Sequence, residues 1–323
     1  MTTNNLSVYT SIIANEAINR GISVSGYTEI NINHAILEYN GHREFISQSK
    51  TGRIGHTTYQ FLFDKWISHE LLLEDGFPVP DTILTNNISE INEFLKKHKE
   101  IVIKPTDSTG GKGITNKIRV EEMAKVGLEI AQKVTSLKDK KVVVQKHLEG
   151  FDYRVLVINY EHVFAVKRTP AYIVGDGLSS MKKLINSWNK TLVIKNRKIK
   201  LNSDLEGFLA KQNYTLESIP EKNAMVSLNN LSNAHQGGIV TDVTDSLLKE
   251  VSEISIDICK KYQCPILGID YMSNDISKEV GKIIELNPHA GLTVHVNPTF
   301  GKTRNVGEKI VDMLFPETVH PIL

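Results

Sequence analysis

The sequence predicts an α+β fold. Helix-like and strand-like segments follow one another irregularly, and most strand-like segments come in neighbouring pairs separated by short turns. Strands joined by tight turns form antiparallel hairpins, whereas a doubly wound parallel sheet needs a helix between its strands. The chain has 323 residues, of which 40% are hydrophobic and 23% are charged. This composition is typical of folded domains, and the length favours about two of them.

Charge, hydropathy and cysteine content exclude several classes of protein. The 38 Lys and Arg residues nearly balance the 37 Asp and Glu residues, so the basic excess typical of a nucleic-acid-binding protein is lacking. No apolar run approaches the length of a membrane span, and the first residues lack the features of a signal peptide. Cys259 and Cys264 form neither a disulfide framework nor a zinc motif and are interpreted as core thiols. We therefore expect a cytoplasmic protein with no nucleic-acid or membrane partner.

The N-terminal region predicts a small α/β segment. Residues 7–20 form a helical pattern that ends at Gly21, residues 22–24 resemble a strand, and residues 28–48 predict short strands. This region is too small and too polar for a core of its own, so we expect it to pack on later parts of the chain.

The next part of the chain predicts alternating helices and strands. Residues 57–75 predict one helix, which Pro78 and Pro80 prevent from continuing. Further helices are expected at 88–97, with Ser89 as a cap, and at 120–136. Strands are expected at 82–84, 101–105, 114–118 and 142–144, and the strands on either side of the loop at 106–113 predict a hairpin.

The second half predicts another set of paired strands. Residues 153–160 and 163–167 are expected to form a strand pair joined near Asn159, and 266–270 and 282–287 two more strands. Helices are expected at 178–190, at 245–262 with Asp245 as N-cap, and at 304–314, with a turn at 175–177. Residues 191–224 carry few signals and are interpreted as an insertion or a substrate-side segment.

A glycine-rich loop follows a lysine at the end of a predicted strand. Lys104 is followed by the candidate phosphate-binding residues Ser108, Thr109, Gly110, Gly111 and Gly113. Glycines let backbone N–H groups approach phosphate oxygens, and a lysine adds a positive charge. The loop is not a Walker A motif, because its spacing differs and no helix follows it. A flexible hairpin turn is the alternative interpretation.

Polar side chains also occupy two strand ends in the second half. Asp270 is expected to end one strand, and Glu285 and Asn287 are two residues apart, so they face the same side of another strand. Two carboxylates and an amide oxygen suit Mg²⁺ carrying nucleotide phosphates. Polar strand ends are the alternative, although a charged Glu285 between apolar residues needs a partner.

Weaker candidates lie elsewhere. Gln145 and Asp152 flank a short hinge that suits a purine edge and ribose hydroxyls, with a solvated turn as the alternative. Arg168 follows an apolar strand and suits a transferring phosphoryl group, with a surface cation as the alternative. Three histidines in loops, His235, His289 and His295, are interpreted as ordinary surface or core residues. Three cations are candidate carboxylate binders: Arg154, Lys302 and Arg304.

Taken in order, these segments resemble an ATP-grasp enzyme. The resemblance rests on Asp64-Lys65, on residues 76–80, 103–113, 145–154 and 167–177, and on Asp270 and residues 285–287. Residues 11–21, 58–65, 214–220, 237–245 and 295–316 resemble more narrowly the cyanophycin synthetase branch, which includes the glutathione-synthetase module of bifunctional glutathione synthetases.

The resemblance implies an ATP-grasp fold with a short N-terminal pre-ATP-grasp α/β segment. Its implied domains are an N-terminal substrate-side domain, a small lobe with the lid loop, and a large lobe with the metal and substrate site, at 1–62, 63–144 and 145–323 respectively. The implied activity is that of an ATP-dependent carboxylate–amine ligase, in which ATP phosphorylates a carboxylate and an amine attacks the acyl phosphate.

The resemblance also implies roles for individual residues. Lys65 and Lys104 would bind the nucleotide phosphates, Lys104 also acting in catalysis, and the loop 108–113 would close over them. Gln145, Lys146 and Leu148 would contact adenine and Asp152 the ribose. Asp270, Glu285 and Asn287 would hold two Mg²⁺ ions, or Mn²⁺ in their place. Arg168 would stabilise the transferred phosphoryl group, and Asn233 would line the acyl-phosphate site.

Two departures from the family pattern leave the substrates open. Gln145 replaces the usual Glu, and His235-Gln236 replaces a common Ser-Thr pair. We expect small amino-acid or peptide substrates and a homo-oligomer, such as a dimer. The alternatives are ligation to a protein tail or polymer end, and a non-catalytic nucleotide-binding partner protein.

Overall fold

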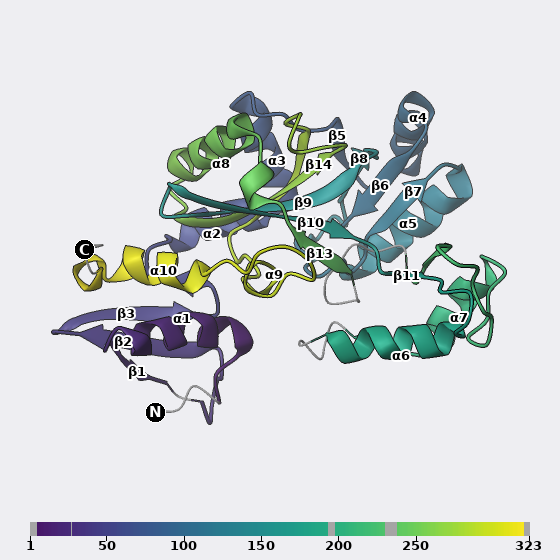
Figure 1. The fold of residues 1–323 in the computed structure, drawn as a ribbon. Helices are drawn as coiled ribbons and strands as arrows, with labels where there is room; N and C mark the ends of the chain where they lie inside the picture. The colour runs from purple at the N-terminus through teal and green to yellow at the C-terminus, as the bar shows by residue number, and fades with distance from the viewer. Residues whose placement is uncertain (1–4, 27, 193–197, 230–237, 320–323) are drawn as a thin grey trace. The chain divides into compact units, whose positions relative to one another are not determined.

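A computed structural model describes residues 5–26, 28–192, 198–229 and 238–319 (Figure 1). The chain forms two compact units, and each is described by itself. The first takes the described residues of Met1–Ala165, Val243–Asn297 and Thr303–Leu323, and the second those of Val166–Asp242 and Pro298–Lys302. In the part of the chain described, every helix is too short or too polar to cross a bilayer.

The N-terminal segment is a helix on a small sheet. Helix α1 (Val8–Asn19) is capped by the Ser7 hydroxyl, and the antiparallel strands lie in the order β1 (Ser23–Ser25), β2 (His34–Tyr39), β3 (His42–Ser47) and β4 (Lys50–Thr51). Ile13 and Leu37 are buried in one cluster with Leu156 and Ile310, which come from much later in the chain. The expectation that this segment packs on later parts is confirmed.

The expectation of one helix over 57–75 is wrong. The segment forms two helices, α2 (His56–Phe63) and α3 (Lys65–Glu74), because Asp64 between them is extended (φ −74°, ψ 121°). The carboxylate of Asp64 accepts hydrogen bonds from the N–H groups of Trp66 and Ile67, both at 2.9 Å. An N-cap inside an apolar pattern therefore starts a new helix with Lys65 as its first residue.

A four-stranded antiparallel sheet follows, with two helices packed on it. Its order is β5 (Thr82–Thr85), β8 (Val142–Lys146), β6 (Ile101–Lys104) and β7 (Thr115–Ile118), and its helices are α4 (Ile88–His98) and α5 (Glu121–Val134). The hairpin of β6 and β7 around the glycine loop is confirmed. The cap of α4 is Asn87 rather than Ser89, because the Asn87 side chain accepts the Ser89 N–H.

The antiparallel strands β9 (Phe151–Ile158), β14 (Ile266–Ser273) and β15 (Lys282–Asn287) form the central sheet of the first unit. One face buries Val155, Ile269 and Tyr271 in a cluster with residues of α2, α3 and α8 (Lys249–Lys261). Leu156 and Ile158 of β9 point to the opposite face and join the cluster of the N-terminal segment. After β9 the chain turns through Asn159 and Tyr160, both with positive φ, as hairpin turns require.

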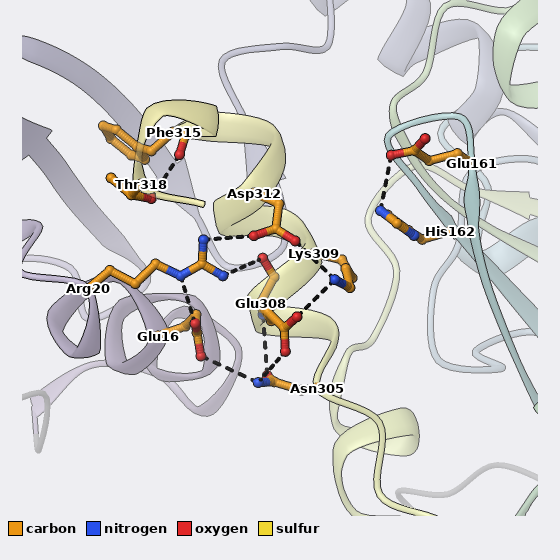
Figure 2. Close-up of polar contacts among 10 residues, drawn as sticks. All are labelled: Glu16, Arg20, Glu161, His162, Asn305, Glu308, Lys309, Asp312, Phe315 and Thr318. Carbon is orange, nitrogen blue, oxygen red and sulfur yellow. Dashed lines mark hydrogen bonds and ion pairs between the residues drawn. The ribbon is translucent and has the colours of Figure 1, made fainter. Parts of the chain in front are cut away.

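One helix in this unit begins later than expected. Helix α8 begins after Leu248 and not at Asp245, which lies in a short 3₁₀ turn, η4 (Thr244–Ser246), and pairs with Arg304 at 2.9 Å. Near the C-terminus follow α9 (Thr293–Val296), α10 (Val306–Leu314) and the 3₁₀ turn η5 (Pro316–Thr318). Arg20, the C-cap of α1, pairs with Glu16 of that helix and with Asp312 of α10, so the two helices are joined (Figure 2).

The second unit has its own small core. Strand β10 (His162–Thr169) enters it and pairs with β13 (Ile239–Asp242), and β11 (Tyr172–Val174) pairs with β12 (Met225–Ser227). Helices α6 (Met181–Thr191) and α7 (Ser203–Ala210) bury Ile185, Leu205 and Leu209 in one cluster with Ile173. Helix α7 and strands β11, β12 and β13 were not expected from the sequence, because each segment is short.

Candidate functional site

Two buried lysines converge on strand β15. Lys104, at the end of β6, donates to Gln145 Oε1 at 3.1 Å and to the Ile284 carbonyl oxygen at 3.2 Å. Burial lowers the pKa of Lys104 to about 8, although the negative charge of Glu285 opposes this. Lys65 Nζ donates to the Ser108 carbonyl oxygen and lies 3.5 Å from Glu285 Oε1. Two buried cations are thus held near one partly exposed carboxylate.

The glycine loop is attached to the start of α3. The Lys65 N–H donates to the Thr106 carbonyl oxygen at 2.8 Å. Gly110, Gly111 and Gly113 have φ of +66°, +80° and +75°, a conformation that side chains rarely adopt. A Cβ on Gly113 would lie 2.7 Å from Pro105 Cγ. The hydroxyls of Thr106 and Ser108 are buried, and within the described chain they neither donate nor accept a hydrogen bond. The loop thus offers unpaired polar groups beside two lysines.

A row of charged side chains crosses the central sheet. Asp270 on β14 lies opposite Arg154 on β9 and opposite Glu285 on β15, so all three project from one face. Asp270 does not end its strand as expected, because β14 continues to Ser273 past a bulge at Tyr271. The expected proximity of Asp270 and Glu285 is confirmed.

Arg154 holds Asp270 with two hydrogen bonds. Its Nε donates to Oδ1 and its Nη2 donates to Oδ2 at 3.0 Å, and both side chains are buried. Gly268 makes room for this fork, because a Cβ there would lie 3.1 Å from Arg154 Cδ and from Nη1. Sequence reasoning singled out Arg154 only as a candidate carboxylate binder. The register between β9 and β14, which places Arg154 opposite Asp270, cannot be read from the residues near either position.

The oxygen atoms of this row suit a hard divalent cation. Asn287 lies two residues beyond Glu285 on the same face, and its Nδ2 donates to Asp270 Oδ2 at 3.3 Å. Within the described ranges, no three His, Cys, Asp or Glu side chains converge as in a zinc site. The donor set of two carboxylates and an amide therefore fits Mg²⁺.

The predicted hinge residues Gln145, Lys146, Leu148 and Asp152 run from the end of β8 through the following segment to the start of β9. The N–H groups of Lys146 and His147 donate to the carbonyl oxygens of Asp81 and Glu100, which anchors the segment. Gly150 has φ of +122°, and a Cβ there would lie 2.7 Å from the Ser273 carbonyl oxygen, so the hinge passes closely over the end of β14. Asp152 pairs in register with Met272 at the start of β9.

The remaining predicted residues are not among the described residues of the first unit. Arg168 belongs to the second unit, where it pairs in register with Val240 of β13. Asn233, His235 and Gln236 lie outside the described residues. The structure thus brings the predicted lysines, loop and oxygen ligands together within the first unit, and their roles stay predictions.

His69 was not predicted as part of this site. It lies one helical turn after Lys65 on α3, is buried, and stacks on Trp66 with ring centroids 5.9 Å apart. Burial and the positive charge of Lys104 lower its pKa to about 4, so it is neutral near pH 7. The i, i+4 spacing from Lys65 was the signal that could have found it. His289, two residues after Asn287, is also neutral, because burial and Lys50 lower its pKa to about 4.

Comparison with known proteins gives the class. Residues 72–219 match the family model described as the ATP-grasp domain of prokaryotic glutathione synthetase. The chain is 32% identical to the cyanophycin synthetase of a Synechocystis species over 295 residues, which is 87% of this chain and 33% of that protein. It is 29% identical to the glutathione biosynthesis bifunctional protein GshAB of Clostridium perfringens, over 96% of this chain and 41% of that protein.

A solved structure supports the same fold. The crystal structure of a bifunctional glutathione synthetase from Pasteurella multocida matches with a TM-score of 0.73 and 26% identity, over 98% of this chain and 44% of that one. The chain therefore has the α+β ATP-grasp fold that the sequence predicts. Within that class it is similar to the ATP-grasp modules of cyanophycin synthetases and of bifunctional glutathione synthetases, and it spans between a third and a half of the length of these relatives.

Proposed function

We propose that this chain is an ATP-dependent carboxylate–amine ligase that forms an amide or peptide bond and releases ADP and phosphate. The observation that carries the proposal is the convergence of Lys65 and Lys104 on the oxygen set of Asp270, Glu285 and Asn287. Phosphoryl transfer needs positioning and charge neutralisation more than a protein nucleophile, and this group offers both.

Each residue of the group has a chemical task in the proposal. The ammonium groups of Lys65 and Lys104 bind the nucleotide phosphates, and the loop 108–113 covers the phosphates and keeps water from the acyl phosphate. Gln145, Lys146 and Leu148 border the adenine and Asp152 the ribose. Arg168 stabilises the transferred phosphoryl group, and Asn233 lines the acyl-phosphate site. Asp270, Glu285 and Asn287 would hold Mg²⁺, which supplies neutralisation of the phosphate charge when bound.

The proposal includes finer features. The reaction uses two Mg²⁺ ions, which Mn²⁺ can replace. The substrates are amino acids or small peptides. The chain acts as a homodimer. A cytoplasmic location agrees with the free thiols of Cys259 and Cys264, both buried in the core. The names of the relatives, cyanophycin synthetase and glutathione synthetase, support amino-acid or peptide substrates.

The test is the release of ADP and phosphate from ATP and Mg²⁺ with amino acids and dipeptides, offered singly and in pairs. We expect release that depends on a particular pair, and a product whose mass is the sum of the two minus water. ATP binding without release for any pair would favour a protein-tail or polymer acceptor. A chain that binds no ATP would contradict the proposal and favour a non-catalytic partner protein.

A further inference from the structure

A chain of hydrogen bonds runs from the first residue of β5 to Lys104. Thr82 and Gln145 lie opposite each other on the paired strands β5 and β8. The Thr82 hydroxyl donates to the Pro80 carbonyl oxygen at 3.0 Å, and Gln145 Nε2 donates to Thr82 Oγ1 at 3.1 Å. Gln145 Oε1 then accepts from Lys104 Nζ at 3.1 Å.

The chemistry of these groups allows only one donor-to-acceptor direction along this series of hydrogen bonds. A carbonyl oxygen can only accept, so the single proton of the Thr82 hydroxyl is directed to Pro80. The Thr82 oxygen must therefore accept, and only the NH₂ end of the Gln145 amide can donate to it. The amide oxygen consequently faces Lys104. If the amide were reversed, an N–H donor would face an ammonium donor, so Thr82 determines the orientation of Gln145.

The same bonds fix the ammonium group of Lys104. An ammonium has three donors, and those of Lys104 reach Gln145 Oε1 and the Ile284 carbonyl oxygen, which leaves one donor for a ligand. Within the described chain, both hydrogen-bond partners of Lys104 Nζ are uncharged oxygens, an amide oxygen and a peptide carbonyl oxygen, and Glu285 and Asp270 act on it only through their charge. Its charge is therefore available to a phosphate while its position is held.

We propose that Thr82 and Gln145 are positioning residues for Lys104, and that Gln145 serves the phosphate end of the nucleotide rather than reading its base. This inference rests on the proposed function, because it assumes that Lys104 binds ATP. It differs from the adenine contact proposed above for Gln145, because each polar atom of the Gln145 amide already has a protein partner, Thr82 for the nitrogen and Lys104 for the oxygen.

The experiment measures the dissociation constants of ATP, GTP and tripolyphosphate, each with Mg²⁺, for the full chain and for Thr82→Val, Thr82→Ser and Gln145→Met. For Thr82→Val and Gln145→Met we expect ATP and tripolyphosphate to bind more weakly by the same factor, about fivefold to tenfold for one lost hydrogen bond. The ratio of ATP to GTP affinity should stay unchanged. Thr82→Ser keeps the hydroxyl and should restore the binding of the unaltered chain.

Thr85→Val is the matched control on the same strand. The Thr85 hydroxyl donates to Glu90 at the start of α4, away from Lys104, so this variant should bind all three ligands normally. Melting temperatures check that each variant is folded. A changed ATP-to-GTP ratio with unchanged tripolyphosphate binding would show that Gln145 reads the base and would overturn the inference. Unchanged ATP binding in Thr82→Val and Gln145→Met would also overturn it, whereas an unaltered chain that binds no ATP would contradict the proposed function itself.

Discussion

At the scale of single residues, the pair of Arg154 and Asp270 determines how the oxygen ligands are held. A buried ion pair contributes little net stability, but removing one partner leaves an uncompensated charge in a dry environment. The Arg154 fork also sets the direction of the Asp270 oxygens, and Gly268 gives it the necessary space. We therefore expect the pair to matter for stability and for metal binding together.

Replacing Arg154 by Met tests this. The free energy of unfolding, measured by urea denaturation, should fall by about 3–5 kcal/mol, because the buried Asp270 loses the charge and both hydrogen bonds of Arg154. Arg43→Met is the control, because Arg43 pairs with Glu38 on an exposed strand surface and its loss should cost about 1 kcal/mol or less. Equal losses in the two variants would contradict the importance of the buried pair.

The ionisation of Lys104 predicts a pH dependence of nucleotide binding. Burial lowers its pKa to about 8, against the opposing charge of Glu285, so the ammonium is present below this pH and is lost above it. ATP affinity should fall by up to about tenfold between pH 7 and pH 9 in the free protein. The guanidinium of a Lys104→Arg variant keeps its charge, so its affinity, even if lower, should lose this dependence. An equally steep profile in that variant would assign the titration to another group.

At the scale of elements, two glycines of the loop are needed for different reasons, Gly113 for folding and Gly111 for ligand binding. A Cβ on Gly113 would meet Pro105 and Val134, whereas a Cβ on Gly111 would meet nothing within 4 Å. Gly113→Ala should therefore lower the free energy of unfolding by more than the roughly 1 kcal/mol expected for a positive φ alone. Gly111→Val should cost less in stability but weaken ATP binding, because its side chain enters the space over the phosphates. Calorimetric unfolding and ATP titration of both variants measure the two effects, and normal ATP binding by Gly111→Val would contradict the loop's role.

The elements also show where sequence patterns are sufficient. The hairpin of β6 and β7, the strands β14 and β15, and helix α10 have strong local patterns, and all were predicted. The break between α2 and α3 was missed because apolar residues lie on both sides of Asp64. The capping hydrogen bonds of Asp64 decide the boundary. Helix α7 was missed because its few apolar residues, such as Leu205 and Leu209, gain stability only in the cluster with β11 and α6.

At the scale of the whole molecule, the beginning and the end of the chain are joined in one core. Figure 2 shows Arg20, the C-cap of α1, between Glu16 and Asp312. Arg20 also donates a hydrogen bond to the Glu308 carbonyl oxygen at 3.3 Å. Burial alone would raise the pKa of Asp312, but hydrogen bonds from Arg20 and Lys309 lower it overall. A carboxylate with a lowered pKa stabilises the fold above its unfolded pKa, and this stability is lost as the pH falls through the folded pKa.

Arg20→Met should therefore lower stability at neutral pH and flatten its loss in acid. We expect a loss of about 1.5–3 kcal/mol in the free energy of unfolding at neutral pH, the range for hydrogen bonds to charged groups. The measurement is urea unfolding at pH 7 and at pH 3 in a Trp188→Phe background, where Trp66 reports only the first unit. Arg43→Met is again the exposed control. The same loss at both pH values would show that Asp312 is not the partner that matters.

The sequence by itself determined the α+β class, most elements, and the residue types of the candidate site. These follow from local patterns: the periodicity of apolar residues, the glycines of the loop, and polar residues beside apolar strands. Only the tertiary structure decided that Arg154 holds Asp270 and that Thr82 orients Gln145. The physical reason is that register between strands far apart in the chain depends on the packing of the whole core, and a local pattern contains no information about it.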